Sequence, residues 1–208
     1  MLLVFFLQTI LLLSFWYVCF RHQAWHNGWL CKMVLFLLPF LFGCLLLWLD
    51  LHIFSVETLR QWHTLFCSFS TLAVLLLLPQ WYKLMWLALQ DLPVSTCSDY
   101  ARLLFTVLFS TIMMLAIIFF FALYYLWLDR LTGYTQGLRS AYLNFQPVLL
   151  DFSTAFYFSF SCYFSLGYGA YYPYGHWFYL LVFLECLIAL INNGIIVFYA
   201  FQLLFDRT

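Results

Sequence analysis

The sequence predicts an all-α integral membrane protein, and two observations support that prediction. Of the 208 residues, 67% are hydrophobic and only 8% are charged, whereas soluble domains carry roughly 25% charged residues. Five apolar stretches are also long enough to cross a hydrocarbon core about 30 Å thick, which takes roughly 20 residues of helix. We therefore expect the chain to fold in a lipid bilayer.

The first three apolar stretches occupy the N-terminal half, over residues 2–20, 33–49 and 62–78. None of them contains the regularly spaced Arg or Lys residues of a voltage sensor, so no voltage sensor is expected. Residues 81–92 follow, with apolar side chains at helical spacing. They form either an interfacial helix or an extension of the third span past Pro79. Residues 1–101 are thus expected to form an N-terminal group of transmembrane helices.

The fourth and fifth stretches cover residues 103–128 and 176–205. Between them, residues 152–164 are apolar but too few to cross, which favours a re-entrant helix. Asp151 and Ser153 suit its N-terminus, because their side chains accept hydrogen bonds from backbone N–H groups. Non-helical backbone after such a helix is tolerated only where protein covers it or where it lines a water-filled cavity.

A glycine-containing loop follows the short helix, with the sequence Ser165, Leu166, Gly167, Tyr168, Gly169. The two glycines can adopt left-handed backbone angles without a Cβ penalty. Alternating handedness turns successive carbonyl oxygens toward one axis, where a ring of such oxygens replaces the hydration shell of a potassium ion. One chain supplies only one strand of this cage, so the prediction requires further copies of the chain around an axis.

Residues 103–205 resemble the pore domain of potassium channels, which consists of an outer helix, a pore helix, a filter and an inner helix. The resemblance rests on the loop 165–169, on the aromatic run before it and on Tyr172-Pro173 after it. Residues 184–189 also resemble the inner helix of small prokaryotic channels of this family. The resemblance implies a homotetramer whose pore domain is residues 102–208. It also implies that potassium is bound through Ser165, Leu166, Gly167 and Tyr168.

The loop departs from the family pattern at several positions. Ala170 stands where the family usually has Asp, and Ser161 stands where some members have a Glu that pairs with it. Ser165 replaces Thr and Leu166 replaces Val. The hydrogen-bond network behind this filter is therefore expected to differ from the usual one.

Four residues are candidates for supporting the filter: Tyr157, Phe158, Ser161 and Glu185. The resemblance places Tyr157 and Phe158 in an aromatic cuff around the filter. Glu185 is the one acid well inside an apolar span, which marks it as a functional candidate. We expect it behind the filter, bonded to backbone groups of the pore loop.

Four residues further along the last span are candidates for lining the inner cavity or for gating: Ala189, Asn192, Asn193 and Gly194. At 100° per residue only one of the two asparagines faces the axis squarely, so the other is expected to bond a neighbouring helix. Ala189 occupies the position of the family's hinge glycine. Gly194 either lets the helix bend or lets helices pack closely.

Charge distribution predicts the orientation in the membrane. An outward-facing pore loop puts the N-terminus outside and the C-terminus in the cytoplasm, in a plasma (inner) membrane. The inner side then holds Arg21, Lys32, Lys83, Arg102 and Arg207, and the outer side holds Arg60, Arg130 and Arg139. This excess of basic residues inside agrees with the positive-inside rule.

The functional prediction is a passive, potassium-selective channel. The alternatives are a less selective cation channel and a non-conducting membrane assembly protein. No enzyme motif is present, so no catalysis and no cofactor is expected apart from potassium as the permeant ion. The expected partners are further copies of the chain and the lipid bilayer. A net charge of zero gives no reason to expect nucleic acid.

Overall fold

The computed structural model describes residues 44–45, 48, 99–132, 135–167 and 169–205. The first and third apolar stretches, most of the second and the whole of residues 81–92 lie outside the described residues. Cys44, Leu45 and Trp48, from the second stretch, are helical.

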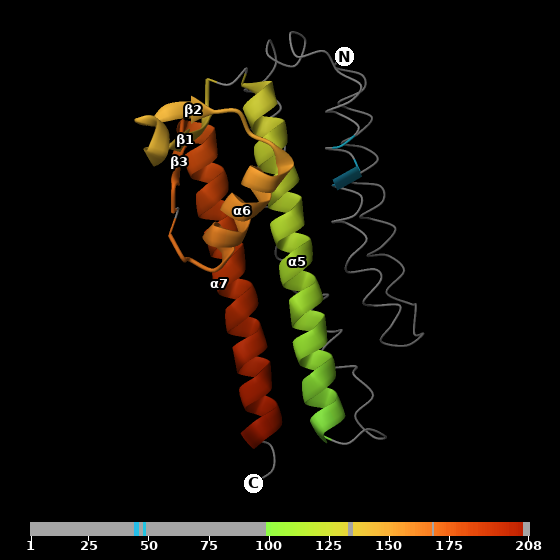
Figure 1. Cartoon of the computed structure of the whole chain (residues 1–208). Coiled ribbons are helices and arrows are strands. Elements are labelled where there is room, and N and C mark those ends of the chain that lie inside the picture. Colours follow the sequence, from blue (N-terminus) through green and yellow to red (C-terminus); the bar gives the residue numbers. More distant parts are fainter. Residues whose placement is uncertain (1–43, 46–47, 49–98, 133–134, 168, 206–208) are drawn as a thin grey trace.

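Two long helices frame the described region (Figure 1). Helix α5 covers Asp99–Leu131 and helix α7 covers His176–Phe205, and they run side by side in opposite directions. Their segments Thr106–Leu131 and His176–Phe198 are each long and apolar enough to cross a membrane. The structure thus contains helices at both expected C-terminal spans, with α5 longer than predicted at each end.

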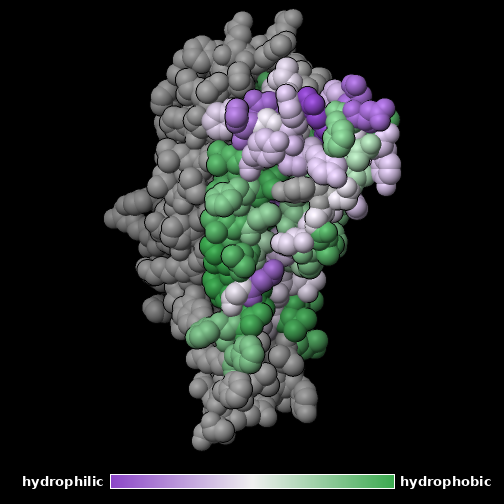
Figure 2. Space-filling view, turned by 90° about the vertical axis from the view of Figure 1, so that its left-hand side faces the viewer, coloured by the Kyte–Doolittle hydropathy of each residue, from purple (hydrophilic) through white to green (hydrophobic). Residues whose placement is uncertain are grey.

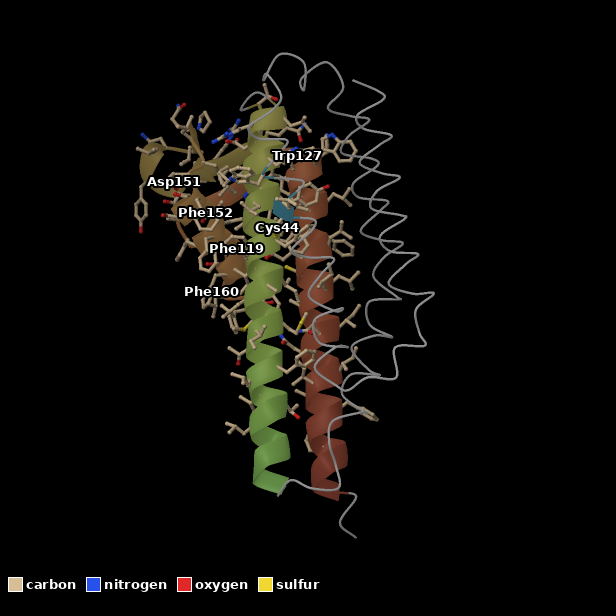
Figure 3. The ribbon with its side chains drawn as sticks, turned by 90° about the vertical axis from the view of Figure 1, so that its right-hand side faces the viewer. Cys44, Phe119, Trp127, Asp151, Phe152 and Phe160 are labelled. Carbon is tan, nitrogen blue, oxygen red and sulfur yellow. The ribbon has the colours of Figure 1, made fainter. Side chains whose placement is uncertain are left out.

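A short helix, α6, covers Phe152–Tyr163 and fills the segment expected to re-enter the membrane. Asp151 caps it, because the Thr154 backbone N–H donates to the Asp151 carboxylate at 2.8 Å, which satisfies a donor left unpaired at a helix start. Hydrogen bonds from Thr154 lower the pKa of the Asp151 carboxyl. Figure 3 shows Asp151 and Phe152 at the upper end of α6 and Phe160 further down.

A small antiparallel sheet corrects the all-α prediction (Figure 1). It has three strands in the order β2-β1-β3, which are β1 (Gly137–Ser140), β2 (Gln146–Val148) and β3 (Tyr171–Tyr174). The first two strands form a hairpin after α5, and the third strand joins the glycine-containing loop to α7. The sheet therefore connects the end of the outer helix to the backbone that follows the candidate filter.

The sheet accepts a proline because β3 is an edge strand. Pro173 pairs with Leu138, and its missing N–H costs no hydrogen bond on the unpaired side of the strand. The hairpin reverses through Asn144 and Phe145, both left-handed with φ of 51° and 60°. Arg139 adds a cation–π contact, with its guanidinium carbon 3.5 Å from the centre of the Tyr174 ring.

The core lies where α6 enters between α5 and α7. The Tyr125 ring centre lies 5.1 Å from that of Phe158 and 5.5 Å from that of Phe178. Each of these rings comes from a different helix, and all three side chains are fully buried. Aromatic rings at such separations attract one another in addition to the stabilisation from burying their surface. These three rings therefore hold α6 against α5 and α7.

The outer surface separates polar from apolar residues along the length of the helices. Figure 2 shows hydrophilic residues gathered over the sheet end of the molecule, with hydrophobic residues below them. Leu190 is 71% exposed and Phe183 is 63% exposed, both on α7. Such surface suits contact with lipid or with other helices and not with water.

Candidate functional site

The five-residue loop lies between α6 and β3, and its placement follows from how α6 ends. The Ser165 backbone N–H donates to the Cys162 carbonyl oxygen at 3.0 Å, and that of Leu166 donates to the Ser161 carbonyl oxygen at 3.0 Å. These bonds satisfy carbonyls at the helix end and turn the chain away from the helix axis. Tyr168 itself lies outside the described residues.

Left-handed backbone recurs at every second residue of the loop. Ser165 has a φ of 53°, Gly167 of 89° and Gly169 of 59°. The two glycines take these angles at no steric cost, whereas Ser165 carries strain. This alternation is the backbone pattern expected of a strand that directs successive carbonyls to one side.

The loop is open in the single protomer. Leu166 is 71% exposed, and Ser165, Gly167 and Gly169 are exposed with it. A large apolar side chain in that position requires cover from another surface. The described residues of the loop are therefore open to contact from outside the protomer.

Helix α6 supports the loop through two of the expected residues. Tyr157 lies beside Gly169, so close that a Cβ on Gly169 would sit 2.9 Å from the Tyr157 hydroxyl oxygen. The Tyr157 ring also meets Tyr171 edge-on, with centres 6.1 Å apart. The Ser161 hydroxyl donates to the Tyr157 carbonyl oxygen at 2.9 Å, so it bonds within its own helix while its own carbonyl accepts from Leu166.

Phe158 is the second aromatic residue expected to support the filter. Its ring is fully buried against Tyr125 of α5, in the core that seats α6. The resemblance implies a place for Phe158 in a cuff around the filter, and that prediction stays open because Tyr168 lies outside the described residues.

Glu185 lies on α7, and its hydrogen-bond partners differ from those expected. Its carboxyl accepts from the Tyr125 hydroxyl at 2.7 Å and is hydrogen-bonded to the Ser159 hydroxyl. It therefore bonds side chains of α5 and α6, whereas we expected backbone groups of the loop. Glu185 is fully buried, and the cluster joins all three helices.

The two asparagines of α7 share one partner on α6. The Asn192 side-chain amide donates to the Tyr163 hydroxyl at 2.7 Å, and that hydroxyl donates to Asn193 Oδ1 at 3.2 Å. Asn192 is buried and Asn193 is exposed, so the two face different surroundings. Both bond α6 at Tyr163, two residues before the loop begins.

The other two gating candidates differ in their surroundings. Ala189 is buried on α7, at 2% exposure. Gly194 is exposed, and a Cβ there would meet no atom within 4 Å. Among the described residues of the chain, no other helix therefore packs closely against Gly194.

The outer end of the loop is held by the sheet. The Ala141 backbone N–H donates to the Ala170 carbonyl oxygen at 2.9 Å. Ala170 therefore has a backbone contact with the hairpin at the position where the family usually carries an Asp side chain. The Trp177 backbone N–H donates to Gln136 Oε1 at 3.1 Å, which ties the start of α7 to the same end.

Sequence reasoning missed three side chains of the site: Tyr125, Ser159 and Tyr163. Each is a hydroxyl inside an apolar helix, and each bonds a polar residue of α7. Hydroxyls inside apolar helical segments are a usable signal, because in surroundings without water they need hydrogen-bond partners.

No protein-family model, no curated protein and no solved structure matches this chain. The functional assignment therefore depends on the residues and geometry described above.

Proposed function

We propose that this chain is the subunit of a homotetrameric, passive potassium channel without a voltage sensor. The observation that carries the proposal is the loop 165–169, whose alternate residues are left-handed and which follows a short helix held between two membrane-length helices. Carbonyl oxygens of Ser165 to Tyr168 from four copies would replace the water around a potassium ion. Ions would then move down their gradient.

The direction of α6 favours a cation at this place. A helix carries a partial negative charge, about half an elementary charge, at its C-terminal end. In α6 that end is Tyr163, immediately before the loop. Four such ends around one axis would stabilise a cation that has just entered or is about to leave the loop.

The environment of the loop supports an assembly of several copies. Leu166 is 71% exposed in the protomer, and Phe164 is 40% exposed. Neighbouring subunits would cover these apolar side chains, since closed cyclic symmetry is the usual way to build a ring from one chain. With the loop at the outer face, the C-terminus lies in the cytoplasm and the protein belongs to the plasma membrane.

A less selective cation channel is the second candidate. Ala170 stands where potassium channels usually carry an acid after the second filter glycine, and Ser161 stands where some of those channels have its partner acid. A filter held by fewer side-chain bonds deforms more easily, which weakens discrimination between potassium and sodium.

Flux through liposomes tests the proposal and separates the two candidates. The purified full chain is reconstituted, and potassium and sodium flux are measured under matched gradients, with barium as blocker. We expect potassium flux to exceed sodium flux, and Gly167→Ala to abolish it. Leu115→Ala, on the 47% exposed flank of α5, is the control that keeps flux.

Equal flux of the two ions would support the less selective channel. Absence of flux for both ions from correctly inserted protein would reject both candidates and leave the non-conducting assembly protein.

A further inference from the structure

Three hydrogen-bond contacts converge on the buried cluster around Glu185. The Tyr125 hydroxyl lies 2.7 Å from Glu185 Oε2. The Ser159 hydroxyl contacts Glu185 Oε1, and it also lies 2.9 Å from the Ile118 carbonyl oxygen. The contacts connect α5, α6 and α7 at one point.

The three contacts need three protons, and the two hydroxyl groups supply only two. Tyr125 has one hydroxyl proton and gives it to Glu185. Ser159 has one hydroxyl proton but faces two oxygen atoms, those of Ile118 and Glu185, which both accept when the carboxyl is ionised. A third proton satisfies the geometry, and the carboxyl of Glu185 is the group that can carry it.

The surroundings of the cluster also favour an uncharged acid. The titratable groups that face Glu185 are Tyr125 from α5, Cys162 from α6 and Cys186 from α7. None of these described groups is basic, and Glu185 is fully buried. A buried carboxylate without a cationic partner takes up a proton in preference to remaining charged.

We propose that Glu185 is a neutral carboxylic acid that donates its proton to Ser159 Oγ, and that this acid positions α6 against both long helices. Ser159 then donates to Ile118, and Tyr125 donates to the carbonyl oxygen of the acid. Every contact has its proton. Loss of the proton leaves Ser159 with one proton for two acceptors, so α6 loses one of its ties to α5 or α7.

Glu185→Gln is the variant that preserves this arrangement. The amide N–H₂ donates to Ser159, and the amide oxygen accepts from Tyr125. Glu185→Ala removes both bonds. We therefore expect the glutamine variant to keep the thermal stability of the wild type and the alanine variant to lose it.

Infrared difference spectroscopy tests the proton directly. Spectra of the full chain in liposomes at neutral pH are compared between wild type and Glu185→Gln. We expect the difference to contain the C=O stretch of one protonated carboxylic acid. In Ser159→Ala that band shifts to higher frequency, because the acid loses its acceptor; a merely structural role of Glu185 predicts no such shift.

A carboxylate band in place of the acid band would overturn the inference, and so would an acid band that is unmoved in Ser159→Ala. The spectrum does not depend on ion flux. An acid band without potassium flux rejects only the proposed function, and potassium flux with a carboxylate band rejects only the protonated acid. That the acid positions α6 for a filter rests on the proposed function. That Glu185 is protonated does not rest on it.

Discussion

Gly167→Ala tests the loop backbone most sharply. Gly167 has a φ of 89°, beyond the left-handed region near about 57° that other residues visit occasionally. A Cβ at this position would meet no atom within 4 Å in the protomer. The substitution therefore adds backbone strain without a clash inside the subunit, and that strain is roughly 1–2 kcal/mol for a non-glycine residue.

In a ring of four subunits, the strain energies of the four substituted loops add. If four loops hold this conformation together while an ion passes, the total is about 4–8 kcal/mol, or roughly three or more powers of ten in the fraction of conducting complexes. Potassium flux into liposomes is the assay, and we expect it to fall to background. Thermal stability should change little, because a loop that relaxes to another conformation loses conduction and not the helical scaffold.

Gly194→Ala is the matched control for stability. It adds the same methyl group on α7, again with no atom within 4 Å of the new Cβ. In a helix Ala is favoured over Gly by roughly 0.5–1 kcal/mol, so its unfolding temperature should rise slightly. Wild-type potassium flux through the Gly167→Ala protein would show that conduction does not depend on the left-handed backbone at Gly167.

Three further predictions concern the scaffold around the loop. Phe158→Ala removes a fully buried ring packed on Tyr125 and should cost roughly 3–5 kcal/mol, measured by unfolding in detergent; an unchanged unfolding curve would contradict the described core. Tyr163→Phe leaves the Asn192 amide without its acceptor and should cost roughly 1–3 kcal/mol, so equal stability of the two proteins would argue against this bond. The pKa of Asp151 is lowered in the folded state, so its capping contribution is present at neutral pH and is lost as pH falls through that folded value. Asp151→Asn keeps a capping side chain and should reduce the loss of stability in acid; the same acid sensitivity in both proteins would show that this carboxyl is not responsible.

Local sequence signals sufficed for the helices of the described region. The last span was expected over residues 176–205, and α7 has those bounds. Asp151 predicted the start of α6, because an acceptor side chain before an apolar run suits a helix N-terminus. Hydropathy and capping act over a few neighbouring residues, so a single sequence displays them.

The sheet was not foreseen because its pairings are not local. Strand β1 pairs with β3, more than thirty residues away, and Gly137 opposes Tyr174. The strands have only three or four residues each, too few for an alternating pattern to stand out. Pro173 argued against a strand, and only its place on the sheet edge makes it acceptable.

The candidate site also combines features that local sequence predicts with contacts that it does not. The cost of an acid in a membrane span marked Glu185 as a functional candidate, but it did not reveal the partners of that acid. Tyr125 lies 60 positions away in the sequence and Ser159 lies 26 away. Their meeting depends on how three helices pack, which no local pattern contains.

Anomalous scattering from rubidium would show whether the loop binds cations on an axis shared by four chains. The full assembly is crystallised in rubidium chloride, since rubidium takes the oxygen sites of potassium. We predict anomalous peaks on a fourfold axis, in line with the carbonyl oxygens of residues 165–168. A dimeric or monomeric particle, or a loop 165–169 that lies away from any shared axis and binds no rubidium, would contradict the claim.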